Sequence, residues 1–319
     1  MNPLYIVAFL DGSLGHEKQT RGILNALKEL TSIEVEYKRL SPPSIKFALI
    51  NWFNYIKSFF GAPYQKKQDC MIDLIIGTGS RTHLSMLLLK RECNAKVVTC
   101  MTPDFPLRRA IDLCFIPQHD RPQVHDNIFV TVGPPSTAVF KDEHDKKRGL
   151  ILAGGIDNKS HQWHSDVFMA QVRSIIENQP AIKWTISSSP RTPADTVQLL
   201  EGFASQNTNV TFFRSEDTPD GWIERAYAEN YTVWVTADSV SMVYEALTAG
   251  CRVGILPVDW KKKSDKFQIS ISYLLEKKMV TNYQTWLAGK NEIKIGVPFN
   301  EASRSAKEIL TRWWPDRLK

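Results

Sequence analysis

The stretch VWVTADSVSMVYE at residues 233–245 decides the fold of this chain. A β-branched run passes through a short polar turn into an amphipathic run, which predicts a strand followed at once by a helix. Gly250 predicts the end of that helix, and residues 253–257 read as the next strand. Such a unit directs free backbone N–H groups and the positive helix end at the carboxyl edge of a parallel sheet, where an anion can bind.

Glu245 lies six residues beyond Ser239, which is roughly 9 Å along a helix at 1.5 Å rise per residue. That length is close to the span from the terminal diphosphate to the ribose of a nucleoside diphosphate. A carboxylate can accept the ribose hydroxyls while Asp238, Ser239 and Ser241 at the helix start receive the phosphates. The stretch therefore indicates a site for a nucleotide-sugar donor.

Size and composition describe an ordinary globular protein. A length of 319 residues predicts two domains of about 150 residues each. The chain is 43% hydrophobic and 23% charged, and its five cysteines are odd in number without a Cys-x-x-Cys pair, which favours a reduced, cytoplasmic protein over a disulfide framework or a zinc site. Residues 4–10 lack a basic flank, and no apolar stretch approaches ~18 residues, so we expect neither a signal peptide nor a membrane span.

Strand and helix patterns alternate along the first half and restart in the second. Strands separated by helices predict a parallel, doubly wound α/β sheet in each half. A charged stretch at 141–148 is the expected linker. We therefore predict an N-terminal Rossmann-like acceptor-side domain at 1–145, a C-terminal Rossmann-like nucleotide-sugar-binding domain at 146–300, and a helix at 301–319 that packs back on the first. Two such domains face a cleft, because ligands bind at strand carboxyl ends.

A glycine loop, Asp11-Gly12-Ser13-Leu14-Gly15-His16, follows the first expected strand. Gly12 and Gly15 let the backbone approach a ligand closely at the start of a helix. The helix start favours a neutral imidazole on His16, which can act as general base toward an acceptor hydroxyl. A capping histidine is the alternative of equal weight.

Asp104 follows a later strand and is expected as a second base or as a ligand of the acceptor hydroxyl, with an ordinary turn residue beside prolines as the alternative. The pair Gly77 and Gly79 imitates the start of a dinucleotide fingerprint. The third glycine is missing, so we interpret it as a turn in which Arg81 can contact a phosphate or the acceptor.

Two loops of the second half carry polar groups that suit phosphate. Gly155 lies in one, and Ser188 and Arg191 lie in the next, where hydroxyls and a guanidinium can hold phosphate oxygens. Each loop alone reads as an ordinary turn, but together with the turn at 236–239 they favour a nucleotide site. His161 and His164 lack an acidic partner at metal-ligand spacing, so we predict no metal site there.

Residues 45–60 combine many aromatic side chains with lysines. We expect this stretch to contact a membrane surface as an interfacial helix, with core packing as the alternative. The net charge of +6 fits attraction to the phosphates of a nucleotide or of an anionic membrane face, and we expect no nucleic-acid partner.

Four segments, at 11–19, 117–120, 189–193 and 236–242, resemble motifs of the plant elongated-mitochondria (mitochondrial fission) family and its bacterial relatives, in the family's order. That family is similar to GT-B glycosyltransferases, which implies two Rossmann-like domains, a metal-independent mechanism and a donor nucleotide bound by the second domain. The first loop and the 239–245 helix also look like those of lipid-linked sugar transferases at the cytoplasmic membrane face. This resemblance implies that His16 lies near the acceptor and that Glu245 contacts the ribose.

We therefore expect a glycosyltransferase, peripheral at the inner membrane face, that moves a sugar from a nucleotide donor to a lipid-linked or cell-envelope glycan acceptor without a metal or other cofactor. A sugar-nucleotide epimerase or hydrolase on the same fold stays open, as does a non-catalytic membrane-associated scaffold of the fission type. The epimerase or hydrolase would use acid and base groups drawn from Asp11, Asp104, His119 and Asp120.

Overall fold

The computed structural model describes residues 2–41, 52, 53, 55, 71–261, 266–289, 293 and 299–318. Within them the chain forms two compact units, one of residues 1–137 with 300–319 and one of residues 138–299. Most of the stretch 45–60, expected at a membrane, lies outside the described residues. Of the three described there, Trp52 and Tyr55 pack on the apolar core of the N-terminal unit, and Phe53 is exposed.

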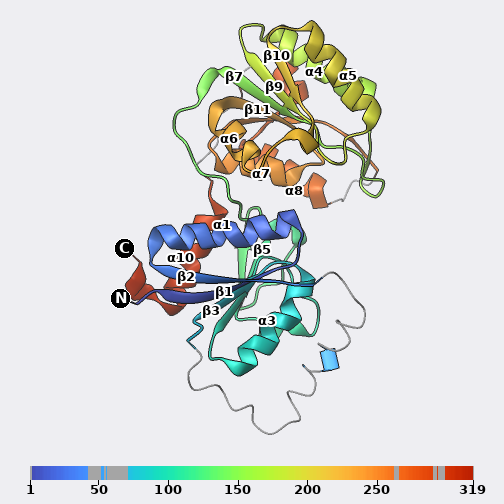
Figure 1. The fold of residues 1–319 in the computed structure, drawn as a ribbon. Helices are drawn as coiled ribbons and strands as arrows, with labels where there is room; N and C mark the ends of the chain where they lie inside the picture. The colour runs from blue at the N-terminus through green and yellow to red at the C-terminus, as the bar shows by residue number, and fades with distance from the viewer. Residues whose placement is uncertain are drawn as a thin grey trace. The chain divides into compact units, whose positions relative to one another are not determined.

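The N-terminal unit is a six-stranded parallel sheet in the order β2-β1-β3-β4-β5-β6. Helices α1 and α10 cover one face and α3 covers the other (Figure 1). Strand periodicity explains the two faces, because Ile6 and Ala8 pack under α1 while Val7 and Phe9 pack against α3. The elements are β1 (Leu4–Leu10), α1 (Leu14–Leu30), β2 (Ile33–Arg39), β3 (Leu74–Gly77), α3 (Ser80–Glu92), β4 (Lys96–Thr99), η1 (Leu107–Ala110), β5 (Leu113–Pro117), η2 (Gln118–Asp120), β6 (Ile128–Thr131), α10 (Glu301–Trp313) and η4 (Pro315–Arg317).

The C-terminal unit repeats this design with a different strand order, β10-β9-β7-β11-β12-β14, again all parallel. Helices α4, α5 and α9 pack on one face around three buried tryptophans, and α6 and α7 lie on the other (Figure 1). The elements are β7 (Asp145–Leu152), β8 (His161–Gln162), α4 (Ser165–Asn178), β9 (Lys183–Ser187), α5 (Ala194–Gln206), β10 (Val210–Phe213), η3 (Ser215–Asp217), α6 (Trp222–Glu229), β11 (Asn230–Thr236), α7 (Val240–Thr248), β12 (Arg252–Leu256), β13 (Asp259–Trp260), α8 (Lys266–Glu276), β14 (Thr281–Asn282) and α9 (Tyr283–Leu287).

In each sheet, the chain adds strands first on one side of the starting strand and then on the other, although all the strands run parallel. We call the boundary between the two sides the strand reversal. In the N-terminal unit the reversal lies between β1 and β3, and in the C-terminal unit between β7 and β11. Loops that leave the carboxyl ends of two such strands run to opposite faces and leave a crevice between them, where α/β proteins bind ligands. The segments directly after β1, β7 and β11 flank these reversals and carry His16, Gly155 and Asp238. Asp104 follows β4, and Ser188 and Arg191 follow β9, each one strand away from a reversal.

The predicted α/β class with two Rossmann-like, doubly wound units is confirmed. The expected linker at 141–148 is wrong in its second half, because β7 already begins at Asp145. The first four residues of β7 are exposed. Their charged side chains therefore stay in water while their backbone belongs to the sheet. Helix α10 belongs to the N-terminal unit, with Ala302, Ala306 and Ile309 in its apolar core.

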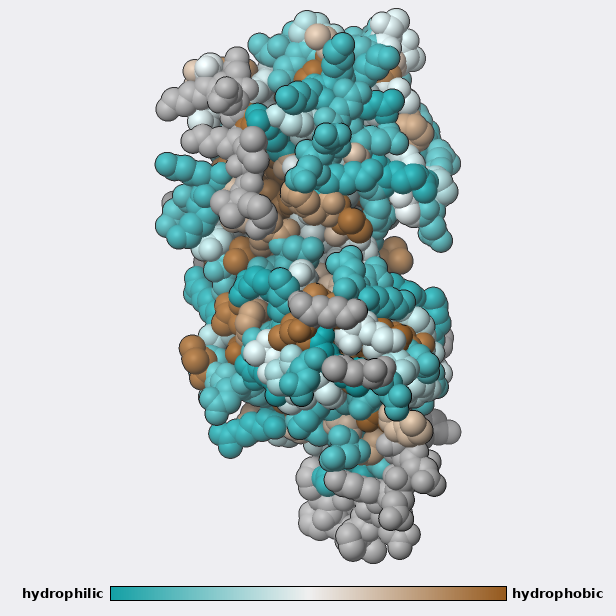
Figure 2. All heavy atoms as spheres, turned by 90° about the vertical axis from the view of Figure 1, so that its left-hand side faces the viewer, coloured by the Kyte–Doolittle hydropathy of each residue, from teal (hydrophilic) through white to brown (hydrophobic). Residues whose placement is uncertain are grey.

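Two further observations concern cysteines and surface. Cys100, Cys114 and Cys251 are free thiols, but Cys93 is disulfide-bonded, so the expectation of a fully reduced chain is wrong. Among the described residues, no helix has both the length and the apolar character to cross a membrane. Hydrophilic residues predominate on the face drawn in Figure 2, with apolar residues singly or in small groups among them, which is ordinary for a folded surface.

Candidate functional site

Three loops meet at the strand reversal of the C-terminal unit. The Gly154 N–H donates to Thr236 Oγ1 at the end of β11, at 2.8 Å. The Gly155 N–H donates to Asp238 Oδ2 at 3.2 Å, and Ser189 Oγ, beyond β9, donates to the Gly154 carbonyl at 2.7 Å. The ends of β7, β9 and β11 are thereby joined by hydrogen bonds into one polar cluster, which we name the C-terminal cradle: residues 154, 155, 189, 191, 238 and 239.

Arg191 and Asp238 form the charged pair of the cradle. The Arg191 guanidinium donates to Asp238 Oδ2 at 2.8 Å and to Ser239 Oγ at 3.3 Å. The Asp238 side chain is 1% exposed and that of Arg191 is 42% exposed. The buried carboxylate therefore fixes the position of the guanidinium, while the exposed part of the Arg191 side chain faces solvent and can bind an anion.

The cradle demands glycine at two positions because the loops approach so closely. A Cβ on Gly154 would lie 2.2 Å from Asp238 Oδ2 and 2.5 Å from Ser239 Oγ. A Cβ on Gly155 would lie 2.0 Å from the Arg191 carbonyl. Any larger residue would separate the three loops, which is the close-approach role of glycine predicted from the sequence.

His161 supports the cradle, although the sequence suggested only a loop position. Its Nε2 donates to the Gly155 carbonyl at 2.8 Å, and its Nδ1 lies 2.8 Å from Ser160 Oγ. The ring is 2% exposed. Buried histidines are normally hydrogen-bonded, and here the bond fixes the glycine turn. The sequence, from which we predicted no metal site at His161 and His164, gave no hint of this role.

Helix α7 contributes the remaining anion-binding feature. Its first turn begins directly after Ser239, so the backbone N–H groups of residues 240–242 have no acceptor within the helix. The helix dipole adds partial positive charge at this end. Together with the Arg191 guanidinium, these donors make the cradle a site that favours a phosphate-sized anion.

Three predicted residues lie differently from the cradle core. Ser188 Oγ accepts from the Ser215 N–H at 2.9 Å, so its hydroxyl serves the neighbouring β10 loop. Ser241 is exposed in the first turn of α7. Glu245 lies farther along α7, is 9% exposed, and has the Tyr227 hydroxyl beside it. Burial first, and then the Glu245 charge, raise the Tyr227 pKa well above its usual value.

A second cluster lies at the strand reversal of the N-terminal unit. His16 Nδ1 lies 2.8 Å from Asp11 Oδ2, and the other Asp11 oxygen accepts the Ser13 N–H at 3.0 Å. The Asp11 side chain is 5% exposed and that of His16 is 38% exposed. Asp11 thus orients the imidazole through Nδ1 and leaves Nε2 available, the arrangement in which a carboxylate positions a general base.

The turn that follows β3 packs against the Asp11–His16 pair. Gly79 has φ +105°, and a Cβ there would lie 2.3 Å from Asp11 Oδ2 and 2.7 Å from His16 Nδ1. Arg81 Nη1 donates to the Asp11 carbonyl at 2.8 Å, and its Nη2 donates to the Ser41 carbonyl. Gly79 is therefore part of the cluster, and Arg81 organises its backbone. We name residues 11, 16, 79 and 81 the N-terminal dyad site.

A buried histidine connects this site to Asp104. His83 is fully buried, and its Nε2 lies 3.1 Å from Thr99 Oγ1. Burial lowers the His83 pKa to about 4, with opposing contributions from Asp104, which raises it, and His16, which lowers it. Both groups therefore lie within electrostatic range of one imidazole, which brings Asp104 to the same region as His16. Asp104 itself is exposed.

The remaining predictions concern the first loop and metal binding. A Cβ at Gly12 or Gly15 would meet nothing within 4 Å, and Gly12 has φ +87°. The need for glycine at Gly12 is thus conformational. His119 and Asp120 lie in η2 after β5. Within the described part of the chain, no three His, Cys, Asp or Glu side chains gather in a way that could hold a metal ion.

Solved structures with the same fold come from sugar-nucleotide enzymes. A UDP-GlcNAc 2-epimerase from Methanocaldococcus jannaschii matches at TM-score 0.59 and 12% identity, covering 98% of this chain and 99% of that one. The Neisseria meningitidis UDP-GlcNAc 2-epimerase bound to UDP-GlcNAc gives 0.57 and 11%, with 97% and 99% covered. A UDP-glucosyltransferase from Polygonum tinctorium gives 0.54 and 8%, with 98% and 93% covered. At these identities the likeness shows the fold, which is the GT-B fold.

No curated protein sequence matches the chain. The family model described as mitochondrial fission ELM1 matches residues 14–313. That match spans both units, from the first turn of α1 to the end of α10. The chain therefore belongs to the mitochondrial fission ELM1 family.

Proposed function

We propose that this protein is a glycosyltransferase that moves a sugar from a nucleotide-sugar donor to a lipid-linked or cell-envelope glycan acceptor. The observation that carries the proposal is the C-terminal cradle, where a half-exposed guanidinium, the start of α7 and a glycine turn converge at a strand reversal. Solved structures of this fold include proteins described as UDP-sugar enzymes, which supports the same class of ligand.

In this proposal the cradle holds the donor diphosphate. The Arg191 guanidinium and the N–H groups at the start of α7 stabilise the negative charge that grows on the departing phosphate. Asp238 positions Arg191 and Gly155 through Oδ2 and does not itself touch phosphate, because its carboxylate is buried and has the same sign of charge. A guanidinium and a helix end can supply this stabilisation without a divalent cation, so we propose a metal-independent transfer.

The N-terminal dyad site supplies the proton chemistry in this proposal. His16 Nε2 takes the proton from the acceptor hydroxyl while Asp11 holds the ring through Nδ1. The hydroxyl oxygen forms the new bond to the sugar carbon, and the bond from that carbon to the diphosphate breaks. The proposal requires both sites to engage one donor–acceptor pair. Asp104 is the second group that can hold the acceptor hydroxyl.

A sugar-nucleotide epimerase or hydrolase is the second candidate. It is favoured by Asp104, a further titratable group in the region of the dyad, and by the fold shared with UDP-GlcNAc 2-epimerases. An epimerase would change the donor sugar with no acceptor present, whereas a transferase would need the acceptor. Chromatography of UDP-sugars incubated with the protein alone separates the two.

Calorimetry against a panel of nucleoside mono- and diphosphates tests the cradle. We expect a nucleoside diphosphate to bind, and Arg191→Gln to weaken that binding by about 10- to 100-fold, because a charge-assisted hydrogen bond is lost. Arg225→Gln, which removes an exposed arginine from α6, is the matched control and should bind normally. A well-folded protein that binds no nucleotide on the panel would refute both enzymatic candidates.

Glu245 provides a separate test within the same site. We propose that its carboxylate accepts the ribose hydroxyls, while the Tyr227 hydroxyl donates to the Met242 carbonyl at 3.3 Å. Glu245→Gln should then weaken a nucleoside diphosphate but leave inorganic pyrophosphate binding unchanged. A loss of thermal stability with unchanged nucleotide affinity would assign Glu245 to the packing of α7 instead.

A further inference from the structure

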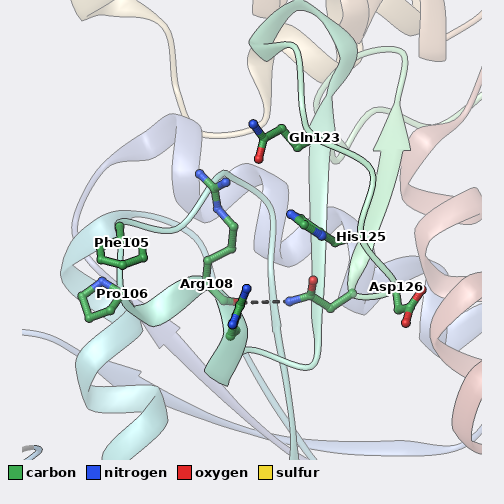
Figure 3. Close-up of a pocket in the computed structure, with 8 residues that line it drawn as sticks. Phe105, Pro106, Arg108, Gln123, His125 and Asp126 are labelled. Atoms are coloured by element: carbon green, nitrogen blue, oxygen red, sulfur yellow. Dashed lines mark hydrogen bonds between the residues drawn. The ribbon is translucent and has the colours of Figure 1, made fainter.

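The N-terminal unit contains a pocket with two arginines in its lining that belongs to neither the dyad site nor the cradle. It lies between the segment that follows β4 and the loop that precedes β6, and its volume is about 830 Å³. Small-molecule sites commonly have volumes of this order. Figure 3 shows Phe105 and Pro106 on one wall, Gln123 and His125 on the other, and Arg108 between them.

The walls of this pocket are fixed by hydrogen bonds and burial. Asn127 Nδ2 donates to the Arg108 carbonyl at 2.8 Å and to the Ile111 carbonyl at 2.9 Å, which joins the two loops. Leu107 in η1 is 4% exposed and anchors that turn in the core. The two arginines that follow Leu107 therefore project from a fixed backbone, as ligand recognition requires.

The charges of the pocket favour an anion. Arg108 Nε is buried and has no hydrogen-bond partner among the described residues. Within the same part of the chain, neither Arg108 nor Arg109 forms an ion pair. Arg191 of the cradle differs, because Asp238 already holds it. The guanidinium groups of Arg108 and Arg109 therefore have donors that no carboxylate in the described part of the chain occupies. Among the described residues that line the pocket, Asp126 is the one carboxylate that opposes an anion.

We propose that this pocket binds a phosphate ester through Arg108 and Arg109, with His125 and Gln123 as further donors. Guanidinium groups match phosphate oxygens in bidentate geometry. Phe105, at the pocket wall and 93% exposed, offers an apolar surface to the rest of the ligand. The pocket begins one residue after Asp104, so within the proposed transfer it would hold a phosphate of the acceptor. That assignment rests on the proposed function, whereas the anion site itself does not.

Titration of the full-length protein with inorganic phosphate and pyrophosphate, followed by calorimetry, tests the site. We expect Arg108→Gln to weaken pyrophosphate binding at this pocket by about 10-fold or more. Asp126→Asn should strengthen it, because it removes the opposing charge. Arg225→Gln changes the net charge equally, outside the pocket, and should have no effect. Opposite shifts in the Arg108 and Asp126 variants would not arise from a general loss of folding.

The cradle also binds phosphate in our proposal, so Arg191→Gln is measured in parallel. Pyrophosphate binding that survives Arg191→Gln but falls with Arg108→Gln supports the second site even where no nucleotide binds. Binding that is abolished by Arg191→Gln alone overturns the second site.

Sedimentation with phosphatidylglycerol vesicles, compared with phosphatidylcholine vesicles, identifies the source of the bound phosphate. Arg108-dependent binding to the anionic vesicles indicates a lipid headgroup, and binding of free phosphate alone indicates a water-soluble ester. If Arg108→Gln reduces neither pyrophosphate binding nor binding to anionic vesicles, the proposal for this pocket is refuted.

Discussion

The two strand reversals of this protein are built alike but hold different partners for a buried carboxylate. In the N-terminal unit Asp11 pairs with His16, and in the C-terminal unit Asp238 pairs with Arg191. In both, a glycine admits the carboxylate where a Cβ would collide, at 2.3 Å for Gly79 and 2.2 Å for Gly154. The carboxylate is buried and its partner is partly exposed in each case.

The difference lies in what the partner can do. Imidazole exchanges a proton in the physiological range, whereas guanidinium stays charged at every accessible pH. The same scaffold therefore produces a site suited to moving a proton in one unit and a site suited to holding an anion in the other. The comparison predicts that damage to the first site changes the rate, and that damage to the second changes affinity.

The largest effect is expected from His16→Ala. Loss of a general base lowers turnover by about 10²- to 10⁴-fold, while nucleotide affinity at the cradle stays as in the wild type. Release of UDP from UDP-sugars measures the rate, and calorimetry measures the affinity. Asp11→Asn should act in the same direction because it frees the ring. If His16→Ala or Asp11→Asn lowered both turnover and nucleotide affinity, the separate roles assigned to the two sites would be wrong.

His83, in the N-terminal unit, predicts a loss of stability in acid. Its pKa is about 4 in the folded protein and about 6.5 when unfolded. Between these values the unfolded chain takes up a proton that the folded chain refuses, so stability falls as pH drops from about 6.5 to 4, by about 3 kcal/mol in total. Above pH 6.5 this contribution to stability is fully present.

Urea unfolding of the wild type and of His83→Gln measures this loss. The comparison is read between pH 6.5 and 5, above the usual range of carboxylates. The variant should lose less stability than the wild type over that interval. Equal slopes would show that His83 takes up its proton in the folded state.

Gly79→Ala and Gly154→Ala should each cost about 1–3 kcal/mol of stability through overpacking. Gly79→Ala should cost more, because it also places a side chain at a φ of +105°. We expect Gly79→Ala to reduce turnover and Gly154→Ala to reduce nucleotide affinity. Thermal unfolding, turnover and calorimetry on both variants check this. Gly202→Ala is the control, since a Cβ there meets nothing within 4 Å. A crossed result, with affinity lost at Gly79, would contradict the assignment.

The smallest effect is expected from Arg191→Lys. The charge remains, but the forked hydrogen bonding to Asp238 and Ser239 is lost, so nucleotide affinity should fall by roughly fivefold, or about 1 kcal/mol. Calorimetry beside Arg191→Gln measures the difference. Equal losses in the two variants would show that geometry outweighs charge at the cradle.

The sequence by itself determined the α/β class, most of the strands, and the loops that carry the sites, because each of these depends on local periodicity and turn residues. Alternation of β-branched residues predicted β11, and Ser239 before an amphipathic run predicted α7. The sequence also proposed His16, Arg191 and Asp238 as site residues from their chemical type and their position after strands, and their roles stay predictions. The error in the second half of the expected linker at 141–148 came from interpreting a charged stretch without core residues as a linker, whereas β7 begins at Asp145 with exposed side chains.

Only the tertiary structure decided which of these residues meet. Strand order depends on contacts between segments far apart in the chain, and no local pattern encodes that β7 lies beside β11 or β1 beside β3. Those neighbours bring Gly79 over the Asp11–His16 pair, aim His161 at the glycine turn, and turn Ser188 toward the β10 loop. The arginine pocket beside Phe105 is a further case, since it forms only when the loop before β6 folds back on η1.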